Sequence, residues 1–328
     1  MQSDESFVSF DVPQELAGKR IDQVITLVLK DYSRSRVQQW LKAGFVTLEG
    51  EIPKPKEVVW GGESVEVQIQ QALGDDSNDT WGAEDIPLNV WHEDDAFLVI
   101  NKPAGMVVHP GAGNKTGTLV NALLFHYPEL SKLPRAGIIH RLDKDTTGLL
   151  VVARDLAAHH FLTSQLQDRA FNREYVAIVH NVMTAGGTID EPMGRHPQHR
   201  TKMAVLPHSN KAKEAITHYR VLEKFRCHTM VKVNLETGRT HQIRVHMGHL
   251  NYPLVGDPLY GGRFRIPPQA DEPLIKVMQE FKRQALHARL LGFINPRTKE
   301  YEEWEAPLPE DMQNLVDELK IDAKTHGE

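Results

Sequence analysis

A carboxylate stands among cations in the segment HRLDKDTTGLL, residues 140–150. Asp143 follows Arg141 and precedes Lys144, and the chain returns to apolar residues after the turn KDTTG. A carboxylate in such a place can act as a nucleophile or as a general base. The same residue types also build salt bridges, so the pattern by itself leaves a purely structural role for Asp143 open.

The element expected to position Asp143 is a strand over residues 136–142, AGIIHRL. In an extended chain Ile139, Arg141 and Asp143 share one face, and Asp143 lies where the strand gives way to a turn. Working residues are often found where a rigid element meets a cleft. A partly buried carboxylate needs a cation or hydrogen bonds to stay charged, and Arg141 and Arg244 are the two candidate cations.

Motifs for several other chemistries are absent from the sequence. It has no G-x-x-x-x-G-K-[ST] and no G-x-S-x-G, and the glycines of GAGNKTG have the wrong spacing for a dinucleotide fingerprint. The lone Cys227 is expected to be a packed strand residue rather than a nucleophile. The histidines at positions 241, 246 and 249 form no H-E-x-x-H. We therefore expect neither a metal nor a cofactor.

The composition is typical of a globular protein from a reducing compartment. Hydrophobic residues make up 40% of the 328 residues and charged residues 25%, and one cysteine allows no intramolecular disulfide. The opening MQSDESFVSF lacks the pattern of a secretory signal, and no apolar run is long enough to span a bilayer. These features predict a cytoplasmic protein without membrane contact, and nothing suggests an obligate dimer, so we expect a monomer.

The charge is distributed unevenly along the chain. The net charge is −6, yet residues 96–300 hold 28 Lys and Arg against 16 Asp and Glu. Residues 71–95 hold eight acids and no Lys or Arg, and residues 301–328 hold nine acids against two bases. Because local potential steers a ligand, a basic body between acidic segments remains compatible with a polyanion such as RNA. A solvated surface of mixed sign explains the charges equally well.

The pattern of apolar residues predicts an α+β protein. Residues 18–30 and 31–44 have apolar residues at helical spacing, and strands follow up to residue 70. Later strands mix with helices at 118–126, 155–169 and 240–250 without strict alternation, which favours a largely antiparallel mixed sheet. We expect an N-terminal α/β module at 1–74, an acidic linker at 75–95, and a catalytic domain at 96–328 that ends in a helix.

Four blocks of the sequence resemble a known family. They are, in chain order, INKPAGMVVHPG (100–111), RAGIIHRLDKDTTGLLVVAR (135–154), REYVAIV (173–179) and ETGRTHQIRVHMGHLNYPLVGDPLYGG (236–262). These blocks are similar, in the same order, to the characteristic blocks of the RluA class of RNA pseudouridine synthases, and most similar to its large-ribosomal-subunit pseudouridine synthase D subfamily. The N-terminal module resembles the S4-type RNA-binding module that several members carry. The resemblance covers nearly the whole chain.

The resemblance implies roles for three catalytic residues. Asp143 would be the catalytic aspartate, and Arg244 would pair with it and keep it ionised. Tyr175 would lie against the target base. Each has an alternative: a salt-bridge partner for Asp143, a phosphate contact on the RNA for Arg244, and a core tyrosine for Tyr175.

The resemblance also implies residues that bind RNA or the target base. Arg141 would reach into the space left by a flipped base, or only screen Asp143. Ile243 would pack on the base, or in the core. Lys102 belongs to a family block but has a structural alternative. The exposed side of the second N-terminal helix would add phosphate contacts from Arg34, Arg36 and Lys42.

The implied reaction converts uridine into pseudouridine without a cofactor. The expected substrate is structured RNA, most of all large-subunit (23S) ribosomal RNA or a pre-ribosomal large subunit. Three alternatives are the same reaction on tRNA, a non-catalytic RNA-binding ribosome-assembly factor, and an RNA hydrolase that uses His140 and Asp143. The intact Asp143, Tyr175 and Arg244 argue against a pure binding protein.

Overall fold

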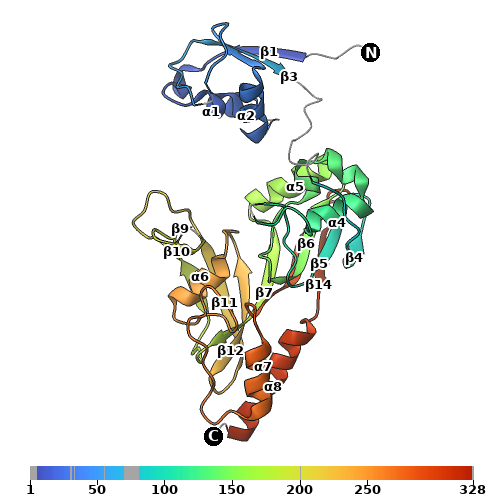
Figure 1. The fold of residues 1–328 in the computed structure, drawn as a ribbon, viewed down its shortest axis with the longest axis vertical. Coiled ribbons are helices and arrows are strands. Elements are labelled where there is room, and N and C mark those ends of the chain that lie inside the picture. The colour runs from blue at the N-terminus through green and yellow to red at the C-terminus, as the bar shows by residue number, and fades with distance from the viewer. Residues whose placement is uncertain are drawn as a thin grey trace. The chain divides into compact units, whose positions relative to one another are not determined.

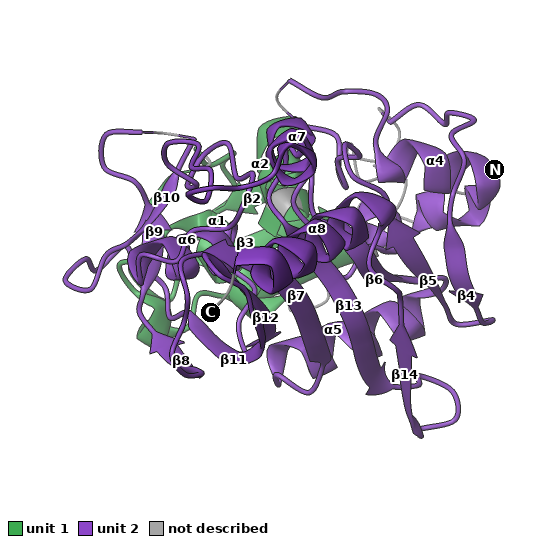
Figure 2. Ribbon diagram, turned by 90° about the horizontal axis from the view of Figure 1, so that it is seen from below, with its two compact units in different colours: residues 1–80 green, residues 81–328 purple. Residues whose placement is uncertain are grey.

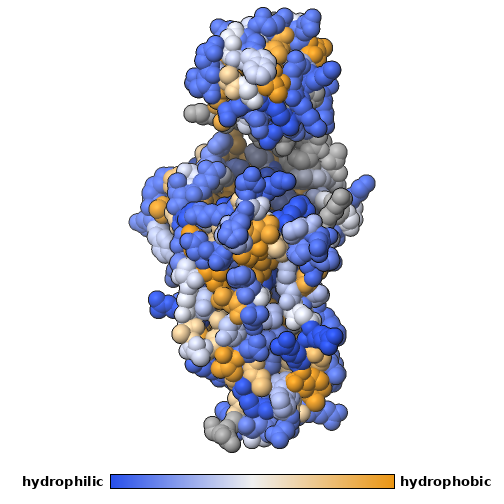
Figure 3. Space-filling model, turned by 90° about the vertical axis from the view of Figure 1, so that its left-hand side faces the viewer, coloured by the Kyte–Doolittle hydropathy of each residue, from blue (hydrophilic) through white to orange (hydrophobic). Residues whose placement is uncertain are grey.

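The computed structural model describes residues 6–29, 32, 34–54, 56–69, 81–111, 113–199 and 201–326. The chain divides into two compact units, unit 1 at residues 1–80 and unit 2 at residues 81–328 (Figure 2). Figure 3 shows hydrophilic side chains over most of one face of each unit, with apolar areas between them. Within the described ranges, no helix is both long enough and apolar enough to cross a membrane.

Unit 1 packs two helices on a three-stranded antiparallel sheet (Figure 1). The helical spacing of its apolar residues places Ile21, Val24 and Ile25 on one face of a helix, where all three are fully buried with Trp40. The sheet order is β1-β3-β2, and the first strand was not expected from the sequence. The elements are β1 (Ser6–Asp11), the short 3-10 helix η1 (Gln14–Leu16), α1 (Ile21–Val28), α2 (Arg34–Ala43), β2 (Val46–Leu48) and β3 (Ser64–Ile69).

Unit 2 is built on a nine-stranded sheet, which confirms the predicted α+β class with a largely antiparallel mixed sheet. The order is β4-β5-β6-β13-β7-β12-β11-β8, β14 pairs with β13, and only β6 and β13 run parallel. A separate hairpin holds β9 and β10. The strands are β4 (Val90–Glu93), β5 (Phe97–Lys102), β6 (Thr147–Ala153), β7 (Asn172–His180), β8 (Gly187–Asp190), β9 (Met193–Arg195), β10 (Met203–Val205), β11 (Ile216–Lys224), β12 (His228–Leu235), β13 (Leu286–Ile294) and β14 (Tyr301–Glu305).

Helices cover both faces of this sheet. Successive side chains on a strand point to opposite faces, so neighbouring residues of one strand pack with different helices. On β7, Ala177 packs with α4 and α6, whereas the next residue, Ile178, packs with α7 and α8. On β6, Leu150 joins the first of these cores, and Leu149 packs with α5 on the opposite face. The helices of unit 2 are α4 (Leu119–His126), η2 (Pro128–Lys132), η3 (Pro134–Gly137), α5 (Leu156–Gln167), α6 (Gln242–His249), α7 (Glu272–Glu280) and α8 (Glu310–His326).

Two segments differ from the expectation drawn from the sequence. The predicted strand over residues 136–142 does not form: Ile138 makes one isolated bridge to Val152, and an irregular segment continues to Asp143. Ala136 and Gly137 belong to a 3-10 helical turn and have positive φ, +51° and +78°, so the backbone is not extended there. Gly137 also packs so closely on β6 that a Cβ would lie 2.1 Å from the Ala153 carbonyl oxygen. Residues 81–95, expected in the linker, belong to unit 2 and include β4. Residues 75–80 lie outside the described residues.

Candidate active site

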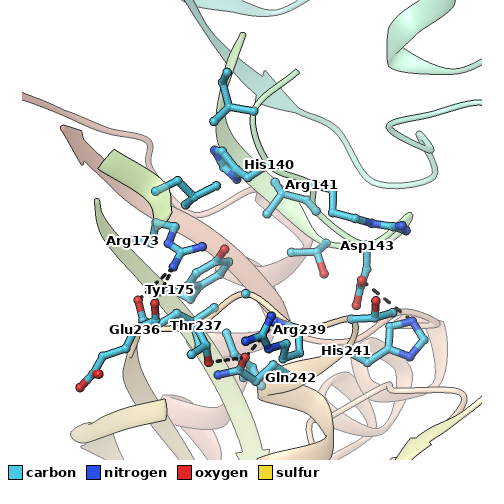
Figure 4. A pocket seen from close by; sticks show the side chains of 18 of the residues that line it. His140, Arg141, Asp143, Arg173, Tyr175, Glu236, Thr237, Arg239, His241 and Gln242 are labelled. Atoms are coloured by element: carbon cyan, nitrogen blue, oxygen red, sulfur yellow. Dashed lines mark hydrogen bonds and ion pairs between the residues drawn. The ribbon is translucent and has the colours of Figure 1, made fainter. Parts of the chain in front are cut away.

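A cavity of about 650 Å³ opens on the face of the unit 2 sheet that carries α6 (Figure 4). Four segments of the chain meet there: the irregular segment at 138–143, strand β7, the turn at 236–241, and the first turn of α6. Side chains from segments far apart in the sequence therefore share one solvent-accessible space. Of the residues predicted for the site, those that line the cavity are Arg141, Asp143, Tyr175, Ile243 and Arg244.

Asp143 and Arg244 form an ion pair at the cavity wall. The Arg244 Nη1 donates to the Asp143 Oδ2 at 3.0 Å, although 101 residues separate the two in the chain. The Asp143 side chain is 16% exposed, while that of Arg244 is 4% exposed. The carboxylate thus has one oxygen held by a buried cation and keeps a share of its surface open to the cavity.

The other edge of the Arg244 guanidinium is bound by Asp257, a residue to which the sequence analysis gave no role. The Arg244 Nε and Nη2 donate to the two Asp257 carboxylate oxygens at 2.7 and 2.9 Å. Burial would raise the pKa of Asp257, but the hydrogen bonds and charge of Arg244 outweigh it and lower that pKa. Gly256, with φ +70°, allows the tight turn before Asp257, because a Cβ there would lie 2.3 Å from the Arg283 carbonyl oxygen.

A second contact reaches Asp143 from His241, which caps α6 in a left-handed conformation. The His241 Nε2 lies 3.9 Å from the Asp143 Oδ1, and its Nδ1 is 2.9 Å from the Tyr260 hydroxyl. The Tyr260 ring also covers Arg244, with 5.1 Å between the guanidinium carbon and the ring centroid. His241, Asp257 and Tyr260 all fall within the block ETGRTHQIRVHMGHLNYPLVGDPLYGG, so the resemblance was the one signal that marked them.

Tyr175 and Ile243 form a mostly apolar part of the wall of the cavity that Asp143 also lines. Tyr175 lies on β7 and Ile243 in the first turn of α6; they are 6% and 4% exposed. Both belong to the same apolar core and also line the cavity. Burial raises the pKa of the Tyr175 hydroxyl, an effect that Arg173 opposes and Asp143 reinforces, so this phenol stays neutral at physiological pH. Core packing and a wall for a planar ligand are compatible roles for the same two side chains.

Arg141 and His140 flank the site in different ways. Arg141 is exposed at the rim of the cavity, where its guanidinium can reach a ligand. The His140 ring instead accepts a hydrogen bond from the Val151 amide through Nε2 at 3.3 Å, and burial together with the charge of Arg173 lowers its pKa to about 3. A histidine that stays neutral at pH 7 is a poor general acid, which argues against the hydrolase alternative.

The structure differs from the sequence prediction for Lys102. Its side chain is fully buried, so it has no surface with which to bind RNA or a base. The Lys102 Nζ donates to three backbone carbonyl oxygens, those of Pro103, Met106 and Lys144, at 2.8, 3.0 and 2.9 Å. Burial lowers the pKa of Lys102 to about 7, although the charges of Asp145 and Asp143 oppose this. The bond to Lys144 ties β5 to the residue after Asp143, which supports the structural alternative.

Replacing Lys102 by methionine should therefore impair positioning of Asp143 rather than RNA contact. Three carbonyl oxygens would lose their buried donor, and we expect a loss of about 2–4 kcal/mol in the free energy of unfolding. Chemical denaturation measures this loss, and Lys299→Met is the matched control because Lys299 bonds one carbonyl from an exposed turn. A stable Lys102→Met variant whose RNA affinity loses salt dependence would contradict the structural role.

Three predicted residues lie in unit 1 and are not among the residues that line the cavity. Arg34 is not a free surface cation: its Nε and Nη2 donate to the buried Asp22 carboxylate at 3.1 and 2.8 Å. Gln38 donates to the same oxygen at 2.8 Å. Burial raises the pKa of Asp22, but Gln38 and Arg34 lower it further than burial raises it. Arg36 is half-buried on α2, and Lys42 is exposed in its last turn.

These contacts define what the site can do chemically. A carboxylate paired with a buried arginine lines a cavity large enough for a nucleotide, and an aromatic ring and an aliphatic side chain line the same cavity. Such a carboxylate can attack an electrophilic carbon or accept a proton. In the described part of the chain, no three His, Cys, Asp or Glu side chains are grouped so that they could hold a metal ion.

Comparison with known proteins identifies relatives over nearly the full length. A family model described as RNA pseudouridylate synthase matches residues 96–249. "Ribosomal large subunit pseudouridine synthase D" of Pseudomonas aeruginosa is 53% identical over 312 residues, 95% of each chain. The protein of that name from Haemophilus influenzae is 50% identical over 97% of each chain. The solved structure titled "Human RNA Pseudouridylate Synthase Domain Containing 4" has a TM-score of 0.56 at 27% identity, and covers 71% of this chain and 93% of its own.

Proposed function

The chain belongs to the RNA pseudouridylate synthase family, and we propose that it isomerises uridines of large-subunit ribosomal RNA with Asp143 as its catalytic residue. The relatives from P. aeruginosa and H. influenzae, named for the ribosomal large subunit, support this choice of substrate, because their similarity extends over both units of the chain. The observation that carries the role of Asp143 is its ion pair with buried Arg244 at the wall of the cavity.

The reaction rearranges one nucleoside without oxidation or hydrolysis. The N1–C1′ bond breaks, the uracil turns within the site, and a C5–C1′ bond forms while C5 loses its proton and N1 gains one. Asp143 would attack C1′, attack C6, or remove the C2′ proton, and each role needs an ionised carboxylate. Arg244 supports the ionised form in all three cases, since it donates a charged hydrogen bond to the carboxylate.

The remaining side chains would hold a uridine taken out of its stack. A planar base would pack against the Tyr175 ring and the Ile243 side chain, both of which line the cavity together with Asp143. Arg141, exposed at the rim, would occupy the place that the flipped base leaves in the RNA. Lys102 has no such role in the proposal, because its burial and its three carbonyl partners give it a positioning role beneath the Asp143 turn.

Mapping of pseudouridines tests the choice of substrate. Total RNA from cells with and without this protein should differ at uridines of the 23S rRNA, and wild-type protein should restore the lost sites. Sites lost from tRNA instead would support the alternative substrate. RNA with no site lost, from cells that still assemble ribosomes poorly, would favour the binding-factor alternative.

Unit 1 is proposed as an S4-like RNA-binding module, joined by an acidic linker to the catalytic unit. It has its own buried core, and α2 carries Arg36 and the exposed Lys42. Arg34 is a weaker candidate for a phosphate contact, because Asp22 already pairs with it. We also propose that the protein acts as a monomer in the cytoplasm, where ribosomal RNA is available to it.

Removal of residues 1–80 should weaken RNA binding more than it slows the chemical step. Two lost phosphate contacts lower the slope of log K against log salt concentration by about 2. Filter binding at several salt concentrations measures the slope, and single-turnover assays at saturating RNA measure the step. Lys42→Ala is a point variant with an expected change of about 1 in the same slope. An unchanged slope and unchanged choice of uridine would mean that unit 1 has another role.

A further inference from the structure

A buried arginine other than Arg244 lines the cavity. Arg173 precedes Tyr175 by two residues on β7, so both side chains point to the same face of the sheet (Figure 4). It is 6% exposed and contributes to the cavity wall. Figure 4 shows Arg173 on one side of Tyr175 and Asp143 on the other. Arg173 therefore borders the same space as the Asp143 carboxylate, at a separate place.

Among the residues that the structure describes, Arg173 differs from the other buried arginines in having no acidic partner. Arg244 pairs with Asp143 and Asp257, and Arg283 pairs with Asp311. Within the described ranges, Arg173 makes hydrogen bonds only from Nη2, to the carbonyl oxygens of Leu235 and Glu236 at 3.3 and 3.2 Å. Its Nε has no acceptor there, and no bond is formed by Nη1. Three of its five N–H donors thus have no protein acceptor among the described residues; the Nε is buried, so the two N–H groups of Nη1 are the ones left for a ligand.

The acidic side chain in this turn, Glu236, pairs with residues other than Arg173. Glu236 offers Arg173 only its backbone oxygen, while its carboxylate pairs with His218 at 2.6 Å and with Arg169 at 3.0 Å. Figure 4 shows the Glu236 side chain extending away from Arg173. The turn also packs closely on the guanidinium, because a Cβ on Gly238 would lie 3.0 Å from the Arg173 Nη1. A larger residue at position 238 would push on this nitrogen.

A buried cation without a counter-ion destabilises a protein unless a ligand supplies the opposite charge. Planar guanidinium groups match phosphate oxygens in shape and hydrogen bonding. We propose that Arg173 binds a backbone phosphate next to the target uridine, and so forms a second fixed point for the nucleotide across the cavity from Asp143. This inference rests on the proposed RNA substrate. A uracil carbonyl oxygen fits less well, because it carries no net charge to compensate the buried guanidinium.

The turn that faces Arg173 is held rigidly, which suits a preorganised site. The Gln242 Oε1 accepts hydrogen bonds from the Thr237 hydroxyl at 2.8 Å and from the Arg239 amide at 2.9 Å. The Thr237 hydroxyl also accepts from the Ile216 amide at 2.9 Å. The carbonyl oxygens that orient Arg173 therefore belong to a fixed turn, so little ordering remains to be done when a phosphate binds.

The test combines protein variants with an RNA that lacks one charge. The probe is a synthetic RNA hairpin that contains a uridine modified by the wild-type protein, with a neutral methylphosphonate at the phosphate on its 5′ or 3′ side. Affinity is measured with Asp143→Asn in every protein, so that no turnover occurs. Arg173→Met should weaken binding of the unmodified hairpin about tenfold and lower the salt slope by about 1. Lys276→Met, at an exposed position on α7, is the control for loss of a remote charge.

The two changes should not be additive. One of the methylphosphonates should weaken binding with Arg173 present and have little further effect with Arg173→Met, as expected when both remove the same contact. Arg173→Lys should keep the salt slope but bind less tightly, since lysine has the charge without the planar fork. Gly238→Ala should weaken binding while the charge is retained, because its Cβ crowds the Arg173 Nη1.

Other outcomes separate the possibilities. Additive losses for both methylphosphonates, with an unchanged salt slope in a stably folded Arg173→Met variant, would overturn the phosphate site and leave Arg173 as a structural support of the turn. A loss in Arg173→Met that disappears with 4-thiouridine in place of the target uridine would assign Arg173 to the base instead. If the wild-type chain modifies no uridine in any ribosomal RNA, the proposed substrate fails rather than this inference alone.

Discussion

Asp143→Asn should abolish pseudouridine formation, by about three orders of magnitude or more, while the protein stays folded and still binds RNA. Asparagine keeps the volume of the side chain but has neither the charge nor the basicity that attack or proton removal requires. The expected loss of stability is small, about 1–2 kcal/mol, because the Asp143 side chain is partly exposed and Arg244 keeps its bidentate pair with Asp257. Loss of negative charge near phosphates should leave RNA affinity equal or slightly higher.

Single-turnover pseudouridine formation, RNA affinity and thermal melting together decide this prediction. Asp145→Asn is the matched control: it is the same substitution in the same turn, at a residue that makes no ion pair with Arg244. We expect it to retain near wild-type activity. Asp143→Glu should also be nearly inactive, since one extra methylene displaces the carboxylate by about 1 Å. A folded Asp143→Asn variant that works at near wild-type rate would leave Asp143 as a salt-bridge residue only.

Arg244→Ala should damage both stability and catalysis. The substitution leaves the fully buried Asp257 carboxylate without its cation, and removal of one partner of a buried pair costs about 3–5 kcal/mol. Asp143 loses its 3.0 Å hydrogen bond at the same time, so the rate of the chemical step should fall by about a hundredfold or more. Equilibrium denaturation and single-turnover kinetics measure the two effects separately.

Two further variants distinguish this effect from loss of any arginine. Arg289→Ala removes a partly exposed arginine that also bonds two carboxylates, those of Glu174 and Glu305, and should cost no more than about 1 kcal/mol with full activity. Arg244→Lys keeps the charge but lacks the fork that bonds both Asp257 oxygens. It should recover part of the stability and little of the rate. Equal losses of stability and rate in Arg244→Ala and Arg289→Ala would contradict the proposal that Arg244 holds the Asp143 carboxylate for catalysis.

The stability loss of Arg244→Ala should depend on pH in a defined direction. In the wild-type protein the pKa of Asp257 is lowered, so its contribution is present above the unfolded value of about 3.9 and is lost as the pH falls through the folded pKa. Without Arg244 the two largest effects that lower the pKa of Asp257 are gone. The amides of Leu259 and Tyr260 still donate to this carboxylate, but burial should now raise its pKa. The variant is then most destabilised at neutral pH, where it buries a charge or takes up a proton. Its melting temperature should approach that of the wild type between pH 7.5 and pH 5.

The sequence by itself determined the class of fold and most of its elements. Apolar residues at helical spacing predicted the helices at 118–126, 155–169 and 240–250, and the structure has helices at Leu119–His126, Leu156–Gln167 and Gln242–His249. Strand patterns such as EYVAIVH are equally local, because side chains alternate or are buried on both faces along the strand itself. Residue types also picked out Asp143 as a carboxylate between cations, and the similarity of four blocks indicated the reaction.

Only the tertiary structure decided which partners these residues have. Arg141, two residues from Asp143, was as good a candidate cation as Arg244 from sequence, but the chain brings Arg244 to it across 101 residues. Lys102 and Arg34 look like available cations in sequence. Folding buries Lys102 against three carbonyl oxygens and pairs Arg34 with Asp22.

The physical reason is that a side chain's environment is set by segments distant in sequence. Residues 136–142 have the composition of a strand, but a strand needs a neighbour to which its amides can bond. Ala136 and Gly137 turn with positive φ against β6, and the segment makes only one bridge to that strand, from Ile138. In the sequence nothing separates Asp257 from the many other acidic residues. In the structure a tight turn at Gly256 precedes it, and its carboxylate accepts a hydrogen bond from Arg244. In the sequence Arg173 is one arginine of a strand. The structure buries it at the cavity, where it has no acidic partner among the described residues. Local pattern specifies the elements, and long-range packing specifies the charges that face the ligand.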